Sequence, residues 1–203
     1  MHREPAALPG YPSPAPLPTG IEGIDHLMNG GVPKGTSLIV GAGKTTVLIS
    51  ILRTVLPRGK TCALVDARDS FDPVRACVAG VDLDRLLWVR CASAEKALKA
   101  VEIIVLSGAF DLTILDLGRG KDLSHADLCW FRLRSAVEKT SGRLLVMARE
   151  SISIKSAGLI IEIRMGLTRW NPPLLLGATF TAERRKPFPV HRVSIDARCI
   201  GNS

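Results

Sequence analysis

The stretch Leu38-Ile39-Val40-Gly41-Ala42-Gly43-Lys44-Thr45-Thr46 joins an apolar run to a glycine turn and a Lys-Thr-Thr triplet. This order predicts a strand that leads into a phosphate-binding loop at the N-terminus of a helix. Free backbone N–H groups and the positive end of the helix dipole attract phosphate oxygens there. Lys44 is expected to reach the outer phosphates, and Thr45 to offer its hydroxyl to Mg²⁺.

The spacing of the glycines departs from the usual phosphate-binding motif. That motif is G-x-x-x-x-G-K-[ST], whereas Ala42 alone separates Gly41 from Gly43. A loop this short cannot curl its amides around a pyrophosphate. Three interpretations stay open: a degenerate site, a loop from which this sequence lacks residues, and an ordinary strand-turn-helix.

Length and composition indicate one globular domain. The 203 residues are 46% hydrophobic, which suffices for a substantial core. No apolar run reaches the roughly 18 residues of a membrane span, and the N-terminus lacks the apolar segment of a secretion signal. We therefore expect a cytoplasmic protein without a membrane partner. The five cysteines are scattered and form no C-x-x-C pair, so they are interpreted as small buried hydrophobes.

Positive charge collects in the last part of the chain. The net charge is +8, and residues 143–203 contribute +6 of it, with ten Lys/Arg and four Asp/Glu. A basic lobe favours a polyanionic partner, and nucleic acid is the expected one. The alternative is a solvated basic surface without a partner.

The chain is expected to divide into an N-terminal arm and one folded domain. Residues 1–18 are rich in proline, with prolines at 5, 9, 12, 14, 16 and 18, which predicts an extended or disordered arm. Residues 19–203 are expected to form a single domain. It opens with a helical pattern from Ile21 to Met28, closed by the glycine-rich turn 29–35.

Strands and helices then alternate, which implies right-handed crossovers and a parallel sheet. Ligands bind such a sheet at the carboxyl ends of its strands, where Gly41, Asp66 and Asp116 all fall. The predicted strands are 38–41, 61–66, 86–91, 112–116 and 144–148, and the predicted helices are 47–56, 73–79, 95–106 and 124–142.

Beyond residue 158 the pattern changes to strands joined without helices. We expect strands over 159–165, 174–182 and 190–195, forming an antiparallel extension. Residues 183–189 are predicted to form the turn between the last two strands. That turn contains three adjacent cations, Arg184, Arg185 and Lys186.

An ordered set of segments resembles the ATPase core of bacterial RecA. The resemblance covers residues 18–117 well and the rest loosely, and as an ordered set it is highly specific. It implies an α/β fold: a RecA-like P-loop NTPase core, with a mostly parallel sheet flanked by helices and an antiparallel C-terminal extension. The segments are Pro18-Thr19-Gly20, 30–35, Gly43-Lys44-Thr45-Thr46, Val65-Asp66-Ala67, Phe71-Asp72-Pro73-Val74, 80–87, Glu95-Lys96-Ala97-Leu98 and 107–111.

The resemblance also implies cofactors and site residues. ATP and Mg²⁺ are the implied cofactors, bound with low affinity. The implied nucleotide contacts are Gly41, Gly43, Lys44, Thr45, Thr46 and Asp72, and the implied metal contacts are Thr45 and Asp116. Asp116 also has a plain alternative, an aspartate that merely ends a strand. No residue is assigned a catalytic role.

Several positions depart from the RecA pattern. Arg68 stands where RecA carries the glutamate that activates the attacking water, and a guanidinium cannot accept a proton. Arg75 replaces the aromatic residue that stacks on adenine, and Arg149 replaces the glutamine that senses the outer phosphate. Asp69 is adjacent to Arg68, but its side chain is expected to point elsewhere.

The DNA-binding parts of RecA are also reduced. Its two mobile loops shrink to about residues 118–123 and 150–156, and the proline-rich arm stands in place of the subunit-joining helix. DNA contact, with single-stranded DNA as the expected form, is therefore assigned to Arg184, Arg185, Lys186, Arg164, Arg169 and Arg192. In a competing interpretation, Arg184 and Lys186 contact the nucleotide phosphate of a neighbouring subunit. The remaining alternative is a solvated turn without a binding role.

Three functions are consistent with these features. The favoured one is a divergent RecA-like accessory protein of SOS-type repair and error-prone DNA synthesis, resembling ImuA, with partners among error-prone polymerase components. Its nucleotide site is degenerate, and its ATP hydrolysis weak or absent. The alternative is an active DNA-dependent RecA-type ATPase or recombinase. An unrelated P-loop enzyme or kinase needs an acid that orients the nucleophile, and only Asp66 and Asp69 offer one.

Overall fold

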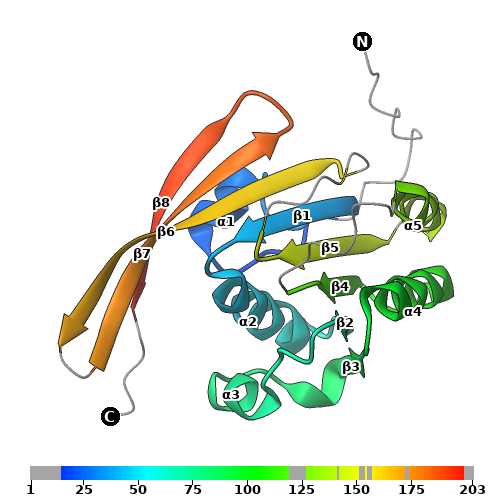
Figure 1. The fold of residues 1–203 in the computed structure, drawn as a ribbon, viewed down its shortest axis with the longest axis horizontal. Helices are drawn as coiled ribbons and strands as arrows, with labels where there is room; N and C mark the ends of the chain where they lie inside the picture. Colours follow the sequence, from blue (N-terminus) through cyan, green and yellow to red (C-terminus); the bar gives the residue numbers. More distant parts are fainter. Residues whose placement is uncertain are drawn as a thin grey trace.

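The computed structural model describes residues 15–118, 127–140, 142–150, 154, 157–171 and 174–198. One sheet of eight strands runs through these residues in the order β3-β2-β4-β5-β1-β6-β7-β8 (Figure 1). The strands are β1 (Gly35–Gly41), β2 (Cys62–Asp66), β3 (Leu86–Arg90), β4 (Leu112–Asp116), β5 (Arg143–Ala148), β6 (Leu159–Asn171), β7 (Leu174–Lys186) and β8 (His191–Arg198).

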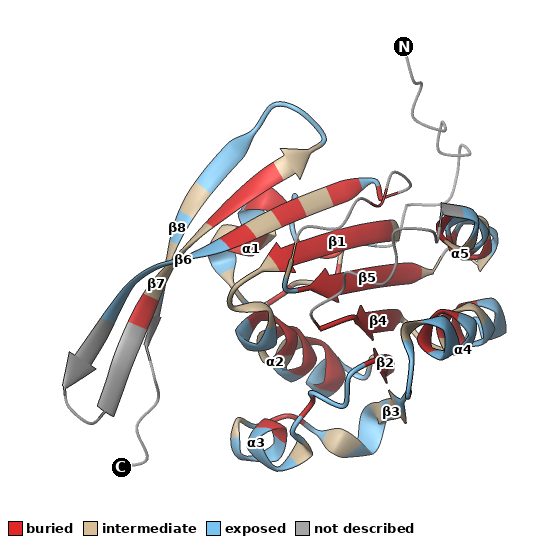
Figure 2. Cartoon of the chain, in the orientation of Figure 1, coloured by how far each residue is buried: buried red, intermediate tan, exposed pale blue. Residues whose placement is uncertain are grey.

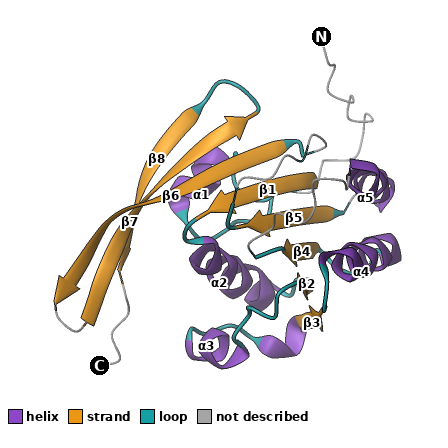
Figure 3. Cartoon of the chain, in the orientation of Figure 1, coloured by secondary structure: helices purple, strands orange, loops and turns teal. Residues whose placement is uncertain are grey.

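Helices lie on both sides of this sheet (Figure 3). They are α1 (Glu22–Leu27), α2 (Lys44–Val55), α3 (Pro73–Val78), α4 (Ala94–Ser107) and α5 (Asp127–Thr140), with short 3-10 turns η1 (Leu56–Arg58) and η2 (Leu83–Arg85). Side-chain caps mark the starts of two of them: the Ser93 hydroxyl at α4 accepts a hydrogen bond from the Lys96 amide, and the Asp72 carboxylate at α3 accepts one from the Arg75 amide. None of the helices in these described ranges is long and apolar enough to cross a membrane.

The strand directions confirm the predicted α/β architecture. β3, β2, β4, β5, β1 and β6 are parallel, and β7 and β8 extend the sheet in antiparallel fashion. The antiparallel part starts one strand later than expected. β6 pairs with β1 in parallel through Ser37–Leu159 to Gly41–Ile163, and only its partner β7 reverses direction.

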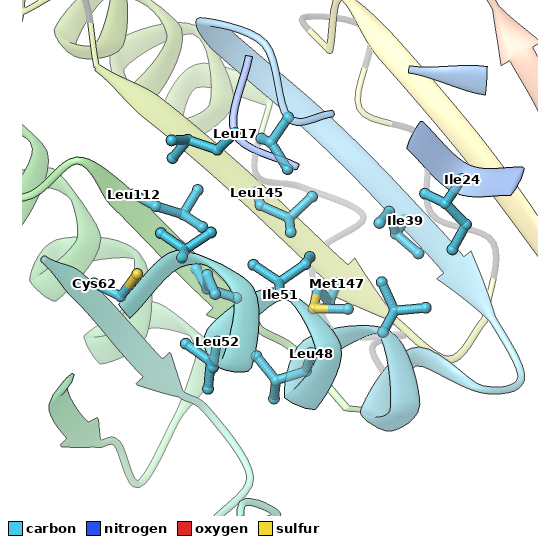
Figure 4. Packing of buried hydrophobic residues seen from close by; sticks show 14 of the residues in the cluster. Leu17, Ile24, Ile39, Leu48, Ile51, Leu52, Cys62, Leu112, Leu145 and Met147 are labelled. Atoms are coloured by element: carbon cyan, nitrogen blue, oxygen red, sulfur yellow. The ribbon is translucent and has the colours of Figure 1, made fainter. Parts of the chain in front are cut away.

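Alternation along the strands divides the core between two faces of the sheet. Ile39 packs on the face covered by α1 and α2, whereas Leu38 and Val40 pack on the face covered by α4 and α5. Figure 4 shows α2 lying over the first face, where Ile51 and Leu52 meet side chains of the central strands. Because both faces are covered, the central strands are buried and mostly apolar.

The predicted arm has a described end. Residues 1–14 lie outside the described residues, but Leu17 is buried in the core and pairs through backbone hydrogen bonds with Val32. The Arg143 guanidinium donates a hydrogen bond to the Ala15 carbonyl at 2.8 Å. The chain is therefore tied to the body before residue 18, the expected boundary.

The cysteines differ from one another in environment. Cys62 is buried, and burial together with the nearby Asp111 charge raises the pKa of its thiol to about 12. Cys91 and Cys129 are half-buried, Cys77 is exposed on α3, and Cys199 lies outside the described residues. The expectation of buried cysteines is therefore wrong for Cys77, because its position on the short helix α3 faces solvent.

Candidate functional site

The connection from β1 to α2 consists of Ala42 and Gly43 alone. Gly41 is the last residue of β1, and a Cβ there would lie 1.9 Å from the Ile163 carbonyl oxygen of β6. Gly43 takes a left-handed conformation, and a Cβ there would lie 2.8 Å from Cε1 of Phe180 on β7. The turn is thus held tightly between α2 and the strands β6 and β7.

The ammonium group of Lys44 is bound to Asp116 rather than directed at solvent. Its Nζ lies 2.5 Å from both carboxylate oxygens of Asp116, and the two side chains are only 12% and 6% exposed. The same carboxylate also accepts hydrogen bonds from the Gly118 amide at 2.8 Å and from the Ser70 hydroxyl at 3.4 Å. A cation therefore already neutralises the residue assigned to the metal.

A second buried carboxylate organises the loop after β2. Asp66 pairs in register with Asp116 and is fully buried. Its oxygens accept hydrogen bonds from the Arg68 amide at 3.1 Å and the Phe71 amide at 2.8 Å. These bonds engage Asp66 in holding residues 68–71, so it is not free to orient a nucleophile.

The position of the expected catalytic base is occupied by Arg68, whose stem lies over Gly118. Asp69 points away from this site: Arg90 on β3 donates to it, with Nε at 2.6 Å from Oδ1. This bond holds the pKa of Asp69 below its usual value. The expected direction of the Asp69 side chain is confirmed.

The other nucleotide contacts expected from the sequence lie near the same edge. Thr45 and Thr46 are exposed on the first turn of α2. Asp72 caps α3, where it also forms an ion pair with Arg75 at 3.3 Å. Arg149 is exposed, and its amide donates to the Gly118 carbonyl at 2.8 Å.

A magnesium–triphosphate complex does not fit these residues as they stand. A turn of two residues presents too few amides to surround the phosphates, and Phe180 closes against Gly43. Lys44 and Asp116 hold each other, so a phosphate and a metal ion would have to separate them first. The residue types of the site are present, but their arrangement serves the protein's own packing.

The three adjacent cations of the extension lie on a strand and not in the predicted turn. β7 runs through Arg184, Arg185 and Lys186, so the turn to β8 begins only at Pro187. Arg184 is buried, and its Nη1 lies 3.4 Å from the Leu27 carbonyl at the end of α1. The expected row of three adjacent exposed cations is therefore wrong, since alternation turns Arg184 into the core.

The remaining cations lie on the opposite side of the extension. Arg164, Arg185 and Arg192 pair there with Glu162 and Glu183. The hydrogen bond from Arg164, assisted by that from Arg185, holds the pKa of Glu162 below its usual value. Lys186 is half-buried, and the side chain of Arg169 lies outside the described residues, as do most of the shortened loops 118–123 and 150–156.

Comparison with known proteins identifies the family. A family model described as the RecA N-terminal domain matches residues 15–119, just over half of the chain. The chain belongs to the RecA N-terminal domain family. The match includes β1 to β4 and the whole Lys44–Asp116 site, which agrees with the family resemblance of the sequence.

Curated relatives of this RecA-family chain include two bacterial proteins named RecA. Protein RecA of Ectopseudomonas oleovorans is 30% identical over 177 residues, covering 79% of this chain and 49% of the relative. Protein RecA of Fusobacterium nucleatum is 40% identical over 105 residues, covering 49% of this chain and 28% of the relative. The chain thus spans about half or less of the length of the curated relatives it matches.

A solved structure has the same fold as this RecA-family chain. The crystal structure of the RadB recombinase matches with a TM-score of 0.65 and 18% identity, covering 88% of this chain and 94% of the RadB chain. At this identity the likeness supports the fold alone.

Sequence reasoning missed three features of the site. Ser70 contacts both Asp66 and Asp116, Arg90 fixes Asp69, and Phe180 packs on Gly43. Each of these contacts joins segments that are far apart in the chain or involves a loop residue without a regular sequence pattern. A signal existed only for Gly43, where glycine before a helix indicated a conformation or a contact that excludes a side chain.

Proposed function

We propose that this RecA-family chain is an accessory protein of DNA repair and error-prone, SOS-type DNA synthesis in the cytoplasm. It binds DNA and protein partners, among them components of error-prone polymerases, and turns over almost no ATP. The family membership supports the DNA-related role. The divergent, ImuA-like assignment is supported by the short loop and by the replaced base position.

The observation that carries the proposal is the ion pair of Lys44 and Asp116 beside Arg68. Phosphoryl transfer relies on a lysine at the phosphates, a carboxylate at the metal and a group that positions the nucleophile. Here the first two neutralise each other at 2.5 Å, and the third is a cation. ATP and Mg²⁺ compete with this pair, so we propose that they bind with low affinity.

An active DNA-dependent ATPase or recombinase is the second candidate. The retention of Lys44, Thr45 and Asp116 in a match of 30% identity over 79% of the chain favours it. The two candidates differ in how ATP affects DNA binding. A recombinase needs coupling between its nucleotide and DNA sites, whereas the proposed accessory protein binds DNA without nucleotide.

The deciding experiment is fluorescence anisotropy of a labelled single-stranded oligonucleotide with and without ATP and Mg²⁺, at constant salt. The accessory protein is expected to bind equally well in both conditions, and Lys44→Met is expected to leave its affinity unchanged. A tightening by ATP of about tenfold or more, abolished by Lys44→Met, would establish the coupled sites of a recombinase instead.

A further inference from the structure

Five charged side chains form one connected network on the outer side of β6, β7 and β8. Arg164 Nε lies 2.9 Å from Glu162, and Arg185 Nε lies 2.7 Å from the other oxygen of Glu162. Arg185 Nη1 also reaches Glu183 at 3.0 Å, and Arg192 Nη2 reaches its second oxygen at 2.9 Å. Each of the four carboxylate oxygens is therefore bound by an arginine, and Arg185 binds one oxygen of each glutamate.

The strand register explains why the network is ordered. Glu162 and Glu183 are directly opposite each other on β6 and β7, and Arg192 is opposite Glu183 on β8. Two carboxylates facing across a sheet repel each other unless cations separate them. Arg185, the extra residue at a register shift, lies between them and bonds to both.

The glutamates of the network are more buried than the arginines. Glu183 and Glu162 are 8% and 27% exposed, while Arg164 and Arg192 are 60% and 65% exposed. An arginine carries five N–H donors, and the ion pairs of Arg164 and Arg192 each use a single nitrogen. Because these two side chains are mostly exposed, their remaining N–H donors are accessible to phosphate oxygens.

The other side of these strands is closed to a large ligand. Ile161, Ile163 and Ala182 are buried in the core shared with α1 and α2, and Figure 2 shows buried and intermediate residues alternating along the first half of β6. Arg184 lies on that closed side. At the level of the network, the outer side is therefore the one that can meet a polyanion.

We infer that a single nucleic-acid strand crosses this outer face over Arg164, Arg185 and Arg192, with its phosphates bound by the outward N–H groups. This inference rests on the proposed DNA-binding function. Glu162 and Glu183 act as positioning residues, because they orient the arginines without touching the ligand. The arginines stand on three adjacent strands about 4.8 Å apart, so the row is about 10 Å wide, the span of a few nucleotides.

The outer face carries a small excess of positive charge at the network and a negative charge further along β8. Three arginines face two glutamates within the network, and Asp196 follows on β8 opposite Thr179. The strand therefore passes over the network itself. Contacts of this kind read phosphates, so binding is independent of base sequence and sensitive to salt.

The test is a salt titration of oligonucleotide binding by the full chain and by Arg164→Ala/Arg192→Ala. The logarithmic salt slope of the double variant is expected to fall by about 1.4, since each cation contributes about 0.7 on single-stranded DNA. Arg132→Ala is the matched control, because Arg132 is equally exposed at 67% and also paired with a glutamate, Glu102 at 2.7 Å, but lies on α5. Its slope is expected to equal that of the parent.

A second variant keeps the test valid if the alanine variant does not fold. Arg164→Lys/Arg192→Lys retains both charges but loses the planar donors, so the slope is expected to stay and the affinity to fall several-fold. If the parent binds and the alanine variant has its affinity and slope unchanged, the strand lies elsewhere and this inference fails alone. If the variants lose ATP binding but not DNA binding, the face holds a nucleotide and the inference is wrong. A parent without DNA binding contradicts the proposed function as well.

Discussion

Asp66 shows how one residue of the site serves the fold. It is fully buried, and its carboxylate holds the amides of Arg68 and Phe71. Asp66→Asn turns an amide group toward these donors, so the free energy of unfolding is expected to fall by about 1–3 kcal/mol in urea denaturation. Asp72→Asn is the control, expected to stay within about 0.5 kcal/mol because asparagine caps a helix as well as aspartate. Equal losses for both would contradict this role.

Arg184 gives a second prediction at this scale. Its guanidinium is buried with one long hydrogen bond to the Leu27 carbonyl. Arg184→Met keeps a long apolar stem and removes a desolvated charge, so stability is expected to remain within about 1 kcal/mol of the parent or to rise. Arg184→Ala also loses the packing of the stem, and we expect a loss of about 2 kcal/mol or more.

Urea denaturation of both Arg184 variants decides between packing and charge. If methionine costs as much as alanine, the guanidinium itself stabilises the end of α1.

The sequence could not show the burial of Arg184, because the side of the sheet on which Arg184 lies depends on where β7 ends. By contrast, the loss of the catalytic base could be predicted from Arg68 alone, since a guanidinium cannot accept a proton in any strand register.

The turn between β1 and α2 is the element that links the site to the extension. Gly43→Ala places a Cβ in a left-handed conformation and 2.8 Å from Phe180. Gly59→Ala is the matched control, because Gly59 is also left-handed but has open space around it. We expect Gly59→Ala to cost about 1 kcal/mol, and Gly43→Ala to cost about 1–3 kcal/mol more by overpacking.

Thermal or urea unfolding of the two glycine variants measures this difference, and Gly43→Ala/Phe180→Ala is expected to remove most of it. Equal costs for the two single variants would show that Phe180 does not restrain the turn.

Elements were predicted best where a local signal marks them. The capped starts of α3 and α4 are examples, whereas β7 extends past its predicted end because the proline turn follows the cations rather than including them.

At the scale of the whole molecule, alternating strands and helices sufficed to predict a parallel sheet with an antiparallel extension. The strand order could not be predicted from the pattern alone, because neighbours such as β1 and β5 are about a hundred residues apart. The loop contacts of Asp66 and Asp116 depend on that order. The residues of the candidate site could therefore be named from the sequence, whereas the ion pair between Lys44 and Asp116 could not be predicted from it.

Assembly provides a prediction at the same scale. The sequence has a proline-rich segment at the place where RecA carries its subunit-joining helix, and proline lacks the backbone N–H group that a helix needs. We expect no long regular filaments with single-stranded DNA and ATP in electron microscopy or light scattering. A RecA protein under the same conditions is the positive control, and helical filaments of this chain would refute the expectation.

ATP turnover in the presence of single-stranded DNA tests the central claim most directly. With Arg68 at the base position and Lys44 bound to Asp116, loss of proton transfer alone removes about 10²–10⁴-fold in rate. We predict a turnover at the background of a Lys44→Met control, with and without DNA. A DNA-stimulated rate on the order of 1 per second or faster, lost in Lys44→Met, would contradict the account and establish a working ATPase.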